Sequence, residues 1–351
     1  MHRPRRADLP VLAVAIAAVG TSGPLIAATV APALTIALWR NVFAVGALTP
    51  YALWKHGAEL RAMSSSEWLA ALGGGVALGA HFATWTPSLN LTSVASATAF
   101  VAAQPIFAAL IALVRGEHVP RKAWIGIVVA VLGVVALSGA DLSVSTRAFG
   151  GDLLALLAGA LAAVYMTFGA KARKTLSLAP YAVICYSTAA VTLLAIDLVA
   201  RQRLAGLPAD AWIKIAALTL GAQLLGHTMF NRALKTVSAT IASVCILLEV
   251  PTAAVIAWLW LGQVPSALAI PGAVLILTGL TVVAIGSGSA AAVVVAVGEP
   301  GAAAPEALTP GEVQTAALAA PADEASPGPR AEAVRHAARG ADHAELPQTE
   351  L

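Results

Sequence analysis

Apolar residues dominate the chain in long runs, and short polar segments separate these runs. A helix needs about 17–25 mostly apolar residues to cross a bilayer. Backbone N–H and C=O groups cannot stay unpaired in lipid, so runs of this kind must form helices. The pattern therefore predicts ten transmembrane helices, near residues 9–28, 34–54, 68–88, 93–114, 121–139, 150–169, 179–199, 211–231, 238–261 and 266–286.

An internal repeat organises these ten segments. A single offset of 146 residues superimposes glycine on glycine at five places, whereas about one match would arise by chance at ordinary glycine frequency. The same offset pairs His81 with His227 and Pro105 with Pro251. The five glycine pairs are Gly23 with Gly169, Gly75 with Gly221, Gly116 with Gly262, Gly126 with Gly272, and Gly133 with Gly279.

The repeat predicts the architecture. Each copy holds five of the predicted helices, and an odd number makes the second copy enter the membrane from the opposite side. We therefore expect an all-α membrane protein built from two inverted five-helix repeats, at residues 9–140 and 149–286. Inverted repeats recur among secondary transporters, where two similar halves of opposite orientation can open a central site to each side in turn.

Composition agrees with a membrane protein. Apolar residues make up 59% of the chain and charged residues only 11%, and the mean hydropathy is +0.82. Soluble domains carry about 25% charged residues. The basic residues lie in short loops and form no single patch, so nucleic-acid binding is not expected.

Charge also predicts orientation. If residues 1–8 are cytoplasmic, the loops on that side hold thirteen Lys and Arg and the opposite loops hold four. Cytoplasmic loops usually carry this excess. We therefore expect a multi-pass protein of the inner (plasma) membrane with both termini in the cytoplasm.

The C-terminal segment differs from the rest of the chain. Residues 287–351 are rich in Ala, Pro, Gly and acidic residues and contain no aromatic residue. Such a segment cannot bury enough apolar surface to fold alone. It is expected to be a disordered cytoplasmic tail.

Several local motifs resemble one known family. Thr92–Ala97, Gln104–Leu110 and Arg115–Glu117 precede Gly126 and Gly133 in the first copy. Thr236–Thr240, Glu249–Ala254 and Gly262-Gln263 precede Gly272 and Gly279 in the second copy, and Leu38-Trp39-Arg40 stands in the second predicted helix. Over residues 9–285 the chain resembles EamA-type transporters of the drug/metabolite transporter superfamily. Gln263 departs from the family, which usually has a Glu there, as at Glu117.

This resemblance implies a function class. Its members are ten-helix inner-membrane proteins that export or exchange small metabolites, often amino acids. A secondary transporter is thus the function that the resemblance implies, and coupling to protons is a further expectation. The alternative is a membrane sensor or scaffold that transports nothing and binds a partner through its acidic tail.

Glu249 is the first candidate for a binding residue. It lies near the middle of the ninth predicted helix, where a charge costs about 2.5–3.5 kcal/mol on insertion scales. Pro251 follows it, and Gln104-Pro105 stands at the matching place in the first copy. Paired interruptions of this kind point to a substrate site. Glu249 is interpreted as a proton or cation carrier or a ligand for a substrate amine, and a protonated packing residue is the alternative.

Two histidines and an arginine complete the candidate set. Trp85 follows His81 by four residues and Asn231 follows His227 by four, so each pair shares one helical face. Histidine can change charge near neutral pH, which suits proton coupling, and the alternative is a neutral histidine bonded to a neighbouring helix. Arg40 is expected either to pair with Glu249 or a ligand carboxylate, or to extend to the outer interface.

Other polar and small residues carry structural predictions. Gly73, Gly74, Gly75 and Gly79 predict a face for close helix packing. Asp197 lies near Arg201 at a predicted helix end, which favours a surface ion pair.

Enzyme chemistry is not indicated. No nucleophile–base arrangement, metal-binding motif or catalytic carboxylate pair stands out, so neither an enzyme, a cofactor nor a metal is expected. The expected partners are membrane lipid, a small solute and protons, with a homodimer as a further possibility.

Overall fold

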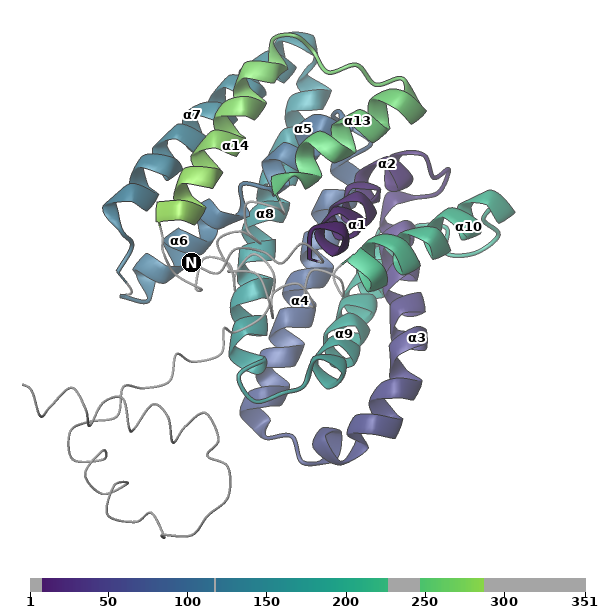
Figure 1. Ribbon diagram of the computed structural model, residues 1–351. Coiled ribbons are helices and arrows are strands. Elements are labelled where there is room, and N and C mark those ends of the chain that lie inside the picture. Colours follow the sequence, from purple (N-terminus) through teal and green to yellow (C-terminus); the bar gives the residue numbers. More distant parts are fainter. Residues whose placement is uncertain (1–7, 117, 227–246, 287–351) are drawn as a thin grey trace, which may run out of the picture. The chain divides into compact units, whose positions relative to one another are not determined.

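The computed structural model describes residues 8–116, 118–226 and 247–286, and its ribbon is shown in Figure 1. Over these residues the fold is all-helical, as predicted, with no strand. The helices are α1 Asp8–Gly20, α2 Ser22–Ala27, α3 Ala33–Arg61, α4 Ser65–Ser88, α5 Val94–Val101, α6 Gln104–Val114, α7 Arg121–Val144, α8 Thr146–Ala172, α9 Leu178–Val199, α10 Ala209–Leu218, the π-helical η1 Thr219–Gly226, α13 Glu249–Leu261 and α14 Ala269–Gly286.

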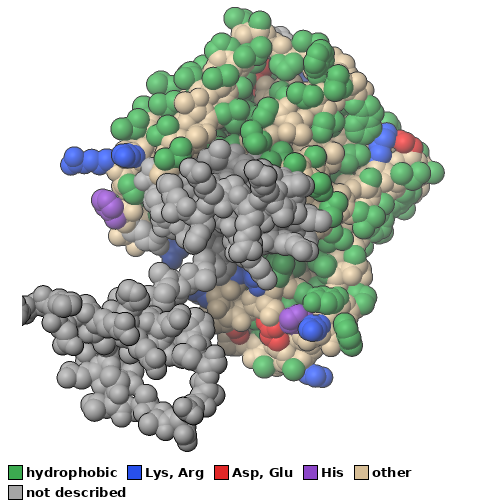
Figure 2. All heavy atoms as spheres, viewed as in Figure 1, with side chains coloured by type: hydrophobic (Ala, Val, Ile, Leu, Met, Phe, Trp, Pro, Cys, Tyr) green, Lys and Arg blue, Asp and Glu red, His purple; other side chains and the backbone are tan. Residues whose placement is uncertain are grey.

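Length and composition suit these helices to a membrane. Within the described ranges, five helical stretches are long and apolar enough to cross one: Ala33–Arg61, Val94–Val114, Arg121–Ser143, Thr146–Ala172 and Leu178–Val199. Shorter apolar helices cover Ala13–Ala27, Glu249–Leu261 and Ala269–Val283. Figure 2 shows that hydrophobic side chains cover most of the visible face of these parts, with charged side chains mainly near its edges.

Proline divides helices that the hydrophobic pattern predicts as continuous. The predicted helix 9–28 is broken into α1 and α2, and the predicted helix 93–114 into α5 and α6. Pro24 and Pro105 lie in the first turns of α2 and α6. A proline has no backbone N–H to give to the carbonyl four residues earlier, and the first turn of a helix tolerates this loss. Pro251 lies likewise in the first turn of α13.

Glycines bring α7 and α14 into close contact. The two helices run antiparallel and side by side (Figure 1), with Gly126 opposite Gly279 and Gly133 opposite Gly272. A Cβ on Gly133 would lie 2.8 Å from the Gly272 carbonyl oxygen. Small residues allow helix backbones to approach this closely in membranes.

The predicted packing face of α4 is confirmed. Gly73 lies against Phe168 of α8, and a Cβ at this glycine would come within 2.9 Å of that ring. Gly79 lies against Thr192 of α9, with a corresponding distance of 2.8 Å. α4 thus packs closely on both α8 and α9.

Gln263 accepts a hydrogen bond from a helix start, a role that a glutamate could also fill. Its Oε1 accepts the backbone N–H of Val94 at 3.1 Å, at the start of α5. The first N–H groups of a helix lack partners within the helix, so this contact caps α5. The departure from the family pattern at Gln263 therefore preserves a cap acceptor, while Glu117 lies outside the described residues.

The predicted surface ion pair of Asp197 is wrong. Its side chain is fully buried, and its Oδ1 accepts a hydrogen bond from Thr35 Oγ1 at 3.3 Å. The end of α9 packs against α3, which removes this carboxylate from the surface. Arg201 follows α9 in a left-handed turn, with φ of 52°.

Candidate functional site

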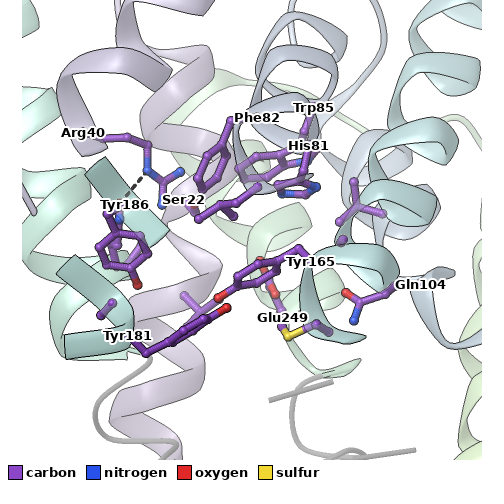
Figure 3. Close-up of a pocket in the computed structure, with 18 of the residues that line it drawn as sticks. Ser22, Arg40, His81, Phe82, Trp85, Gln104, Tyr165, Tyr181, Tyr186 and Glu249 are labelled. Atoms are coloured by element: carbon purple, nitrogen blue, oxygen red, sulfur yellow. Dashed lines mark hydrogen bonds between the residues drawn. The ribbon is translucent and has the colours of Figure 1, made fainter. Parts of the chain in front are cut away.

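A cavity of about 180 Å³ lies among α1–α6, α8, α9, η1 and α13 (Figure 3). At ~30 Å³ per liquid water molecule it has room for about six waters. Its walls combine aromatic rings with a few polar groups, which is typical of small-molecule sites. The polar and aromatic residues that line it are Ser22, Arg40, His81, Phe82, Trp85, Gln104, Tyr165, Tyr181, Tyr186, Gln223 and Glu249.

Arg40 lies buried in the wall of this cavity. Only 3% of the residue is exposed. Its Nε donates to Gln223 Oε1 at 2.9 Å, and its guanidinium carbon lies 4.4 Å from the centre of the Phe82 ring. Its Nη1 has no hydrogen-bond acceptor among the described residues. Of the two alternatives for Arg40, the burial of its side chain favours pairing with a ligand carboxylate.

Glu249 is the first residue of α13 and lines the same cavity. Its charge and that of Arg40 attract each other, but the two groups do not come within the 4.0 Å of an ion pair. Figure 3 shows the two side chains at separate parts of the cavity. The site thus holds a guanidinium and a carboxyl group that are not joined to each other.

His81 and Trp85 share one face of α4, as predicted, and both line the cavity. Their rings stack with centres 5.9 Å apart and an angle of 16°. His81 Nδ1 lies 2.9 Å from the Ala158 carbonyl oxygen of α8, so it must carry the proton of that hydrogen bond. His81 therefore fills the packing role of the alternative interpretation and also borders the cavity.

The residues of the two proline motifs, Gln104-Pro105 and Glu249–Pro251, do not all line the same cavity. Gln104, at the start of α6, lines the cavity with Glu249, whereas Pro105 does not line it. Pro251 lines a second cavity, on the other side of α13. His227 and Asn231 lie outside the described residues.

Several site residues were missed by the sequence analysis. Three of the four tyrosines of the chain, Tyr165, Tyr181 and Tyr186, line this one cavity. Tyr186 lies well inside its predicted helix, away from the helix ends where membrane tyrosines gather, and this position was an available signal. Gln223 lies in the π-helical segment η1, and such segments are frequent at functional sites.

Comparison with known proteins identifies the family. The model of the EamA-like transporter family matches residues 9–139 and again residues 149–285. A solved crystal structure has the same fold, with a TM-score of 0.55 at 19% identity, over 81% of this chain and 99% of the other.

Two curated relatives are described as transporters. An uncharacterized transporter of Archaeoglobus fulgidus is 33% identical over 142 residues, which are 39% of this chain and 47% of the relative. The uncharacterized transporter YdfC of Bacillus subtilis is 25% identical over 187 residues, 52% of this chain and 60% of the relative. The matches thus span about half the length of these relatives.

Proposed function

Because the chain belongs to the EamA-like transporter family, we propose that it is a secondary transporter that exports or exchanges small zwitterionic metabolites of the amino-acid class. Its place in the membrane and a small solute as its cargo follow from the family. The substrate class, the direction and the coupling are the proposal.

The observation that carries the substrate class is the pair of separated charges in one buried cavity. Arg40 has an unpartnered Nη1 among the described residues, and a guanidinium is well suited to bind a carboxylate. Glu249 supplies the opposite charge for an α-ammonium group. A zwitterion that lies between them satisfies both groups, and the small volume of the cavity favours a small solute such as alanine.

Proton coupling is proposed to run through Glu249. A buried carboxyl that faces a ligand site can carry a proton when the site is empty and release it when an ammonium group binds. Glu249 would then bind the solute on one side of the membrane and a proton on the other side, in turn. His81 is a secondary candidate, because its Nδ1 proton is already held by Ala158.

Alternating access is proposed to use the two inverted five-helix repeats, with ten membrane helices in all. The symmetry of the α7–α14 contact supports this arrangement. Gly126 and Gly272 are equivalent by the 146-residue offset, as are Gly133 and Gly279, and the pairs in contact are Gly126 with Gly279 and Gly133 with Gly272. A two-fold axis in the membrane plane produces this exchange of partners. Both termini, including residues 287–351, are proposed to be cytoplasmic.

Counterflow in proteoliposomes tests the substrate class. Vesicles preloaded with unlabelled alanine should accumulate external labelled alanine. Ethylamine lacks the carboxylate that Arg40 would bind, and propionate lacks the ammonium group that Glu249 would bind. We therefore expect alanine to compete, and each analogue to compete at least about tenfold more weakly, since a charge-assisted hydrogen bond is worth about 1.5–3 kcal/mol.

The contrary result is equal competition by ethylamine or by propionate. It would show that only one of the two charged groups contacts the solute. Empty liposomes and a panel of larger amino acids serve as controls for leakage and for the size of the cavity.

A further inference from the structure

A second cavity lies among α5, α7, α13 and α14 and has a volume of about 460 Å³. None of the residues that line it lines the central cavity. Much of its wall is apolar and comes from Leu137, Val250, Ile270, Val274 and Leu277. Its size falls within the ordinary range of small-molecule sites.

Asp141 stands in this wall, near the end of α7. The residue is 8% exposed, and its Oδ2 has no hydrogen-bond donor among the described residues. A buried carboxylate oxygen without a donor is costly, so such a group calls for a positive or proton-bearing partner.

The carboxyl of Asp152 strengthens the need for a positive or proton-bearing partner. Asp141 interacts electrostatically with Asp152, which is 1% exposed and stands near the start of α8. Asp152 Oδ1 accepts from Thr92 Oγ1 at 2.8 Å, but its Oδ2 has no donor in the described part of the chain. Two ionised carboxylates offer only acceptors, so neither can satisfy the other, and their charges repel.

The protein supplies no cation to this pair within the described ranges. No Lys, Arg or His is among the residues that line the cavity. The nearby Arg147 donates instead to the backbone oxygen of Asn90, at 3.0 Å. The described residues also contain no group of three acidic, His or Cys side chains that could hold a metal ion.

We propose that this second cavity is a binding site for an organic ammonium ion with an apolar body, whose charged end binds Asp141 beside Asp152. The ammonium group would donate to the unpartnered carboxylate oxygens and reduce the repulsion between the two acids. The alkyl or aryl body would lie against the apolar wall formed by α13 and α14. An inorganic cation would leave most of the 460 Å³ unused.

This site does not depend on the proposed transport function. It is separate from Arg40 and Glu249, although Val250 and Pro251 of the same helix line it. A chain that binds the ammonium ion but transports no amino acid would leave the second site valid and remove the proposed function.

Thermal unfolding of the full chain in lipid nanodiscs tests the proposal. Hexylammonium is the probe, with hexanol as the neutral and hexanoate as the anionic analogue of the same length. A ligand that binds only the folded protein raises the unfolding temperature with its concentration. We expect hexylammonium to raise it, saturating with concentration, and both analogues to bind at least about tenfold more weakly.

Two variants locate the binding. Asp141→Asn should lower hexylammonium affinity by about tenfold or more, and it should fold because asparagine has the same size and no charge to repel Asp152. Ala273→Phe keeps both carboxyls and fills part of the cavity, so it should also weaken binding. Asp197→Asn is the control, because Asp197 is also buried and has an unpartnered Oδ2 among the described residues, but lines neither cavity.

Three results would overturn the proposal. The first is hexylammonium binding that Asp141→Asn and Ala273→Phe leave unchanged. The second is stabilisation by sodium chloride that depends on Asp141 and is not matched by hexylammonium, which would identify an inorganic cation site. The third is no stabilisation by any cation, which would leave a proton shared between the two carboxyls as the occupant.

Discussion

Arg40→Gln is expected to weaken transport of a zwitterionic amino acid by about 100-fold, because truncating one partner of a buried, hydrogen-bonded charge pair costs about 2–5 kcal/mol. Arg40 is a cation of the central cavity whose Nη1 has no acceptor among the described residues, and Gln223 and Phe82 hold its side chain in place. Glutamine removes the positive charge and keeps a polar side chain near Gln223. The measurement is the concentration dependence of alanine counterflow in proteoliposomes.

Arg40→Lys refines this prediction. Lysine keeps the charge but loses the planar group that can bind Gln223 and a carboxylate together. We expect it to fall between the wild-type chain and Arg40→Gln. Arg203→Gln is the control, since the Arg203 side chain donates to the loop carbonyl oxygens of Ala205 and Gly206 and lines neither of the two cavities. Equal affinities in the wild-type chain and in Arg40→Gln would remove Arg40 from the binding site.

Glu249→Gln is expected to abolish accumulation driven by a pH gradient while leaving exchange measurable. With one proton per solute, a gradient of one pH unit supplies about 1.4 kcal/mol and can sustain about tenfold accumulation. Glutamine cannot gain or lose a proton, so the variant should accumulate no solute above equilibrium. It keeps an acceptor oxygen toward an ammonium group, so solute–solute exchange should persist at reduced affinity.

Glu67→Gln is the control for this experiment. Glu67 lies in the capping box at the start of α4, where its carboxylate accepts the Ser64 N–H at 2.7 Å. Glutamine also fits a capping box, so the helix start should be preserved. If Glu249→Gln still accumulates alanine tenfold per pH unit, the proton is carried elsewhere.

The helical fold was predictable because its causes lie in local sequence. Long apolar runs require helices in lipid, and glycines such as Gly79 and Gly133 mark the places where helices meet. The positions where predicted helices break into two were harder to predict from the sequence. A proline such as Pro105 shows where a hydrogen bond is missing, but the choice between a kink and two separate helices depends on packing against other helices.

The candidate site was predictable only in part, for the same reason. Charges within apolar runs identified Glu249 and Arg40, because lipid makes such residues costly. Whether Arg40 turns inward depended on Gln223 and Phe82, which come from distant parts of the chain. Asp141 and Asp152 were not predicted as a pair, because the contact depends on how α7 and α8 fold back on each other.

Accessibility of the central cavity from both sides tests the central claim most directly. Ser22 lines this cavity, and Ser22→Cys can be studied after Cys185 and Cys245 are replaced with alanine. A membrane-impermeant thiol reagent should modify Cys at position 22 from either side of oriented vesicles, and alanine should slow the reaction from both sides. Modification from one side only, under all conditions of substrate and pH, would contradict alternating access at this cavity.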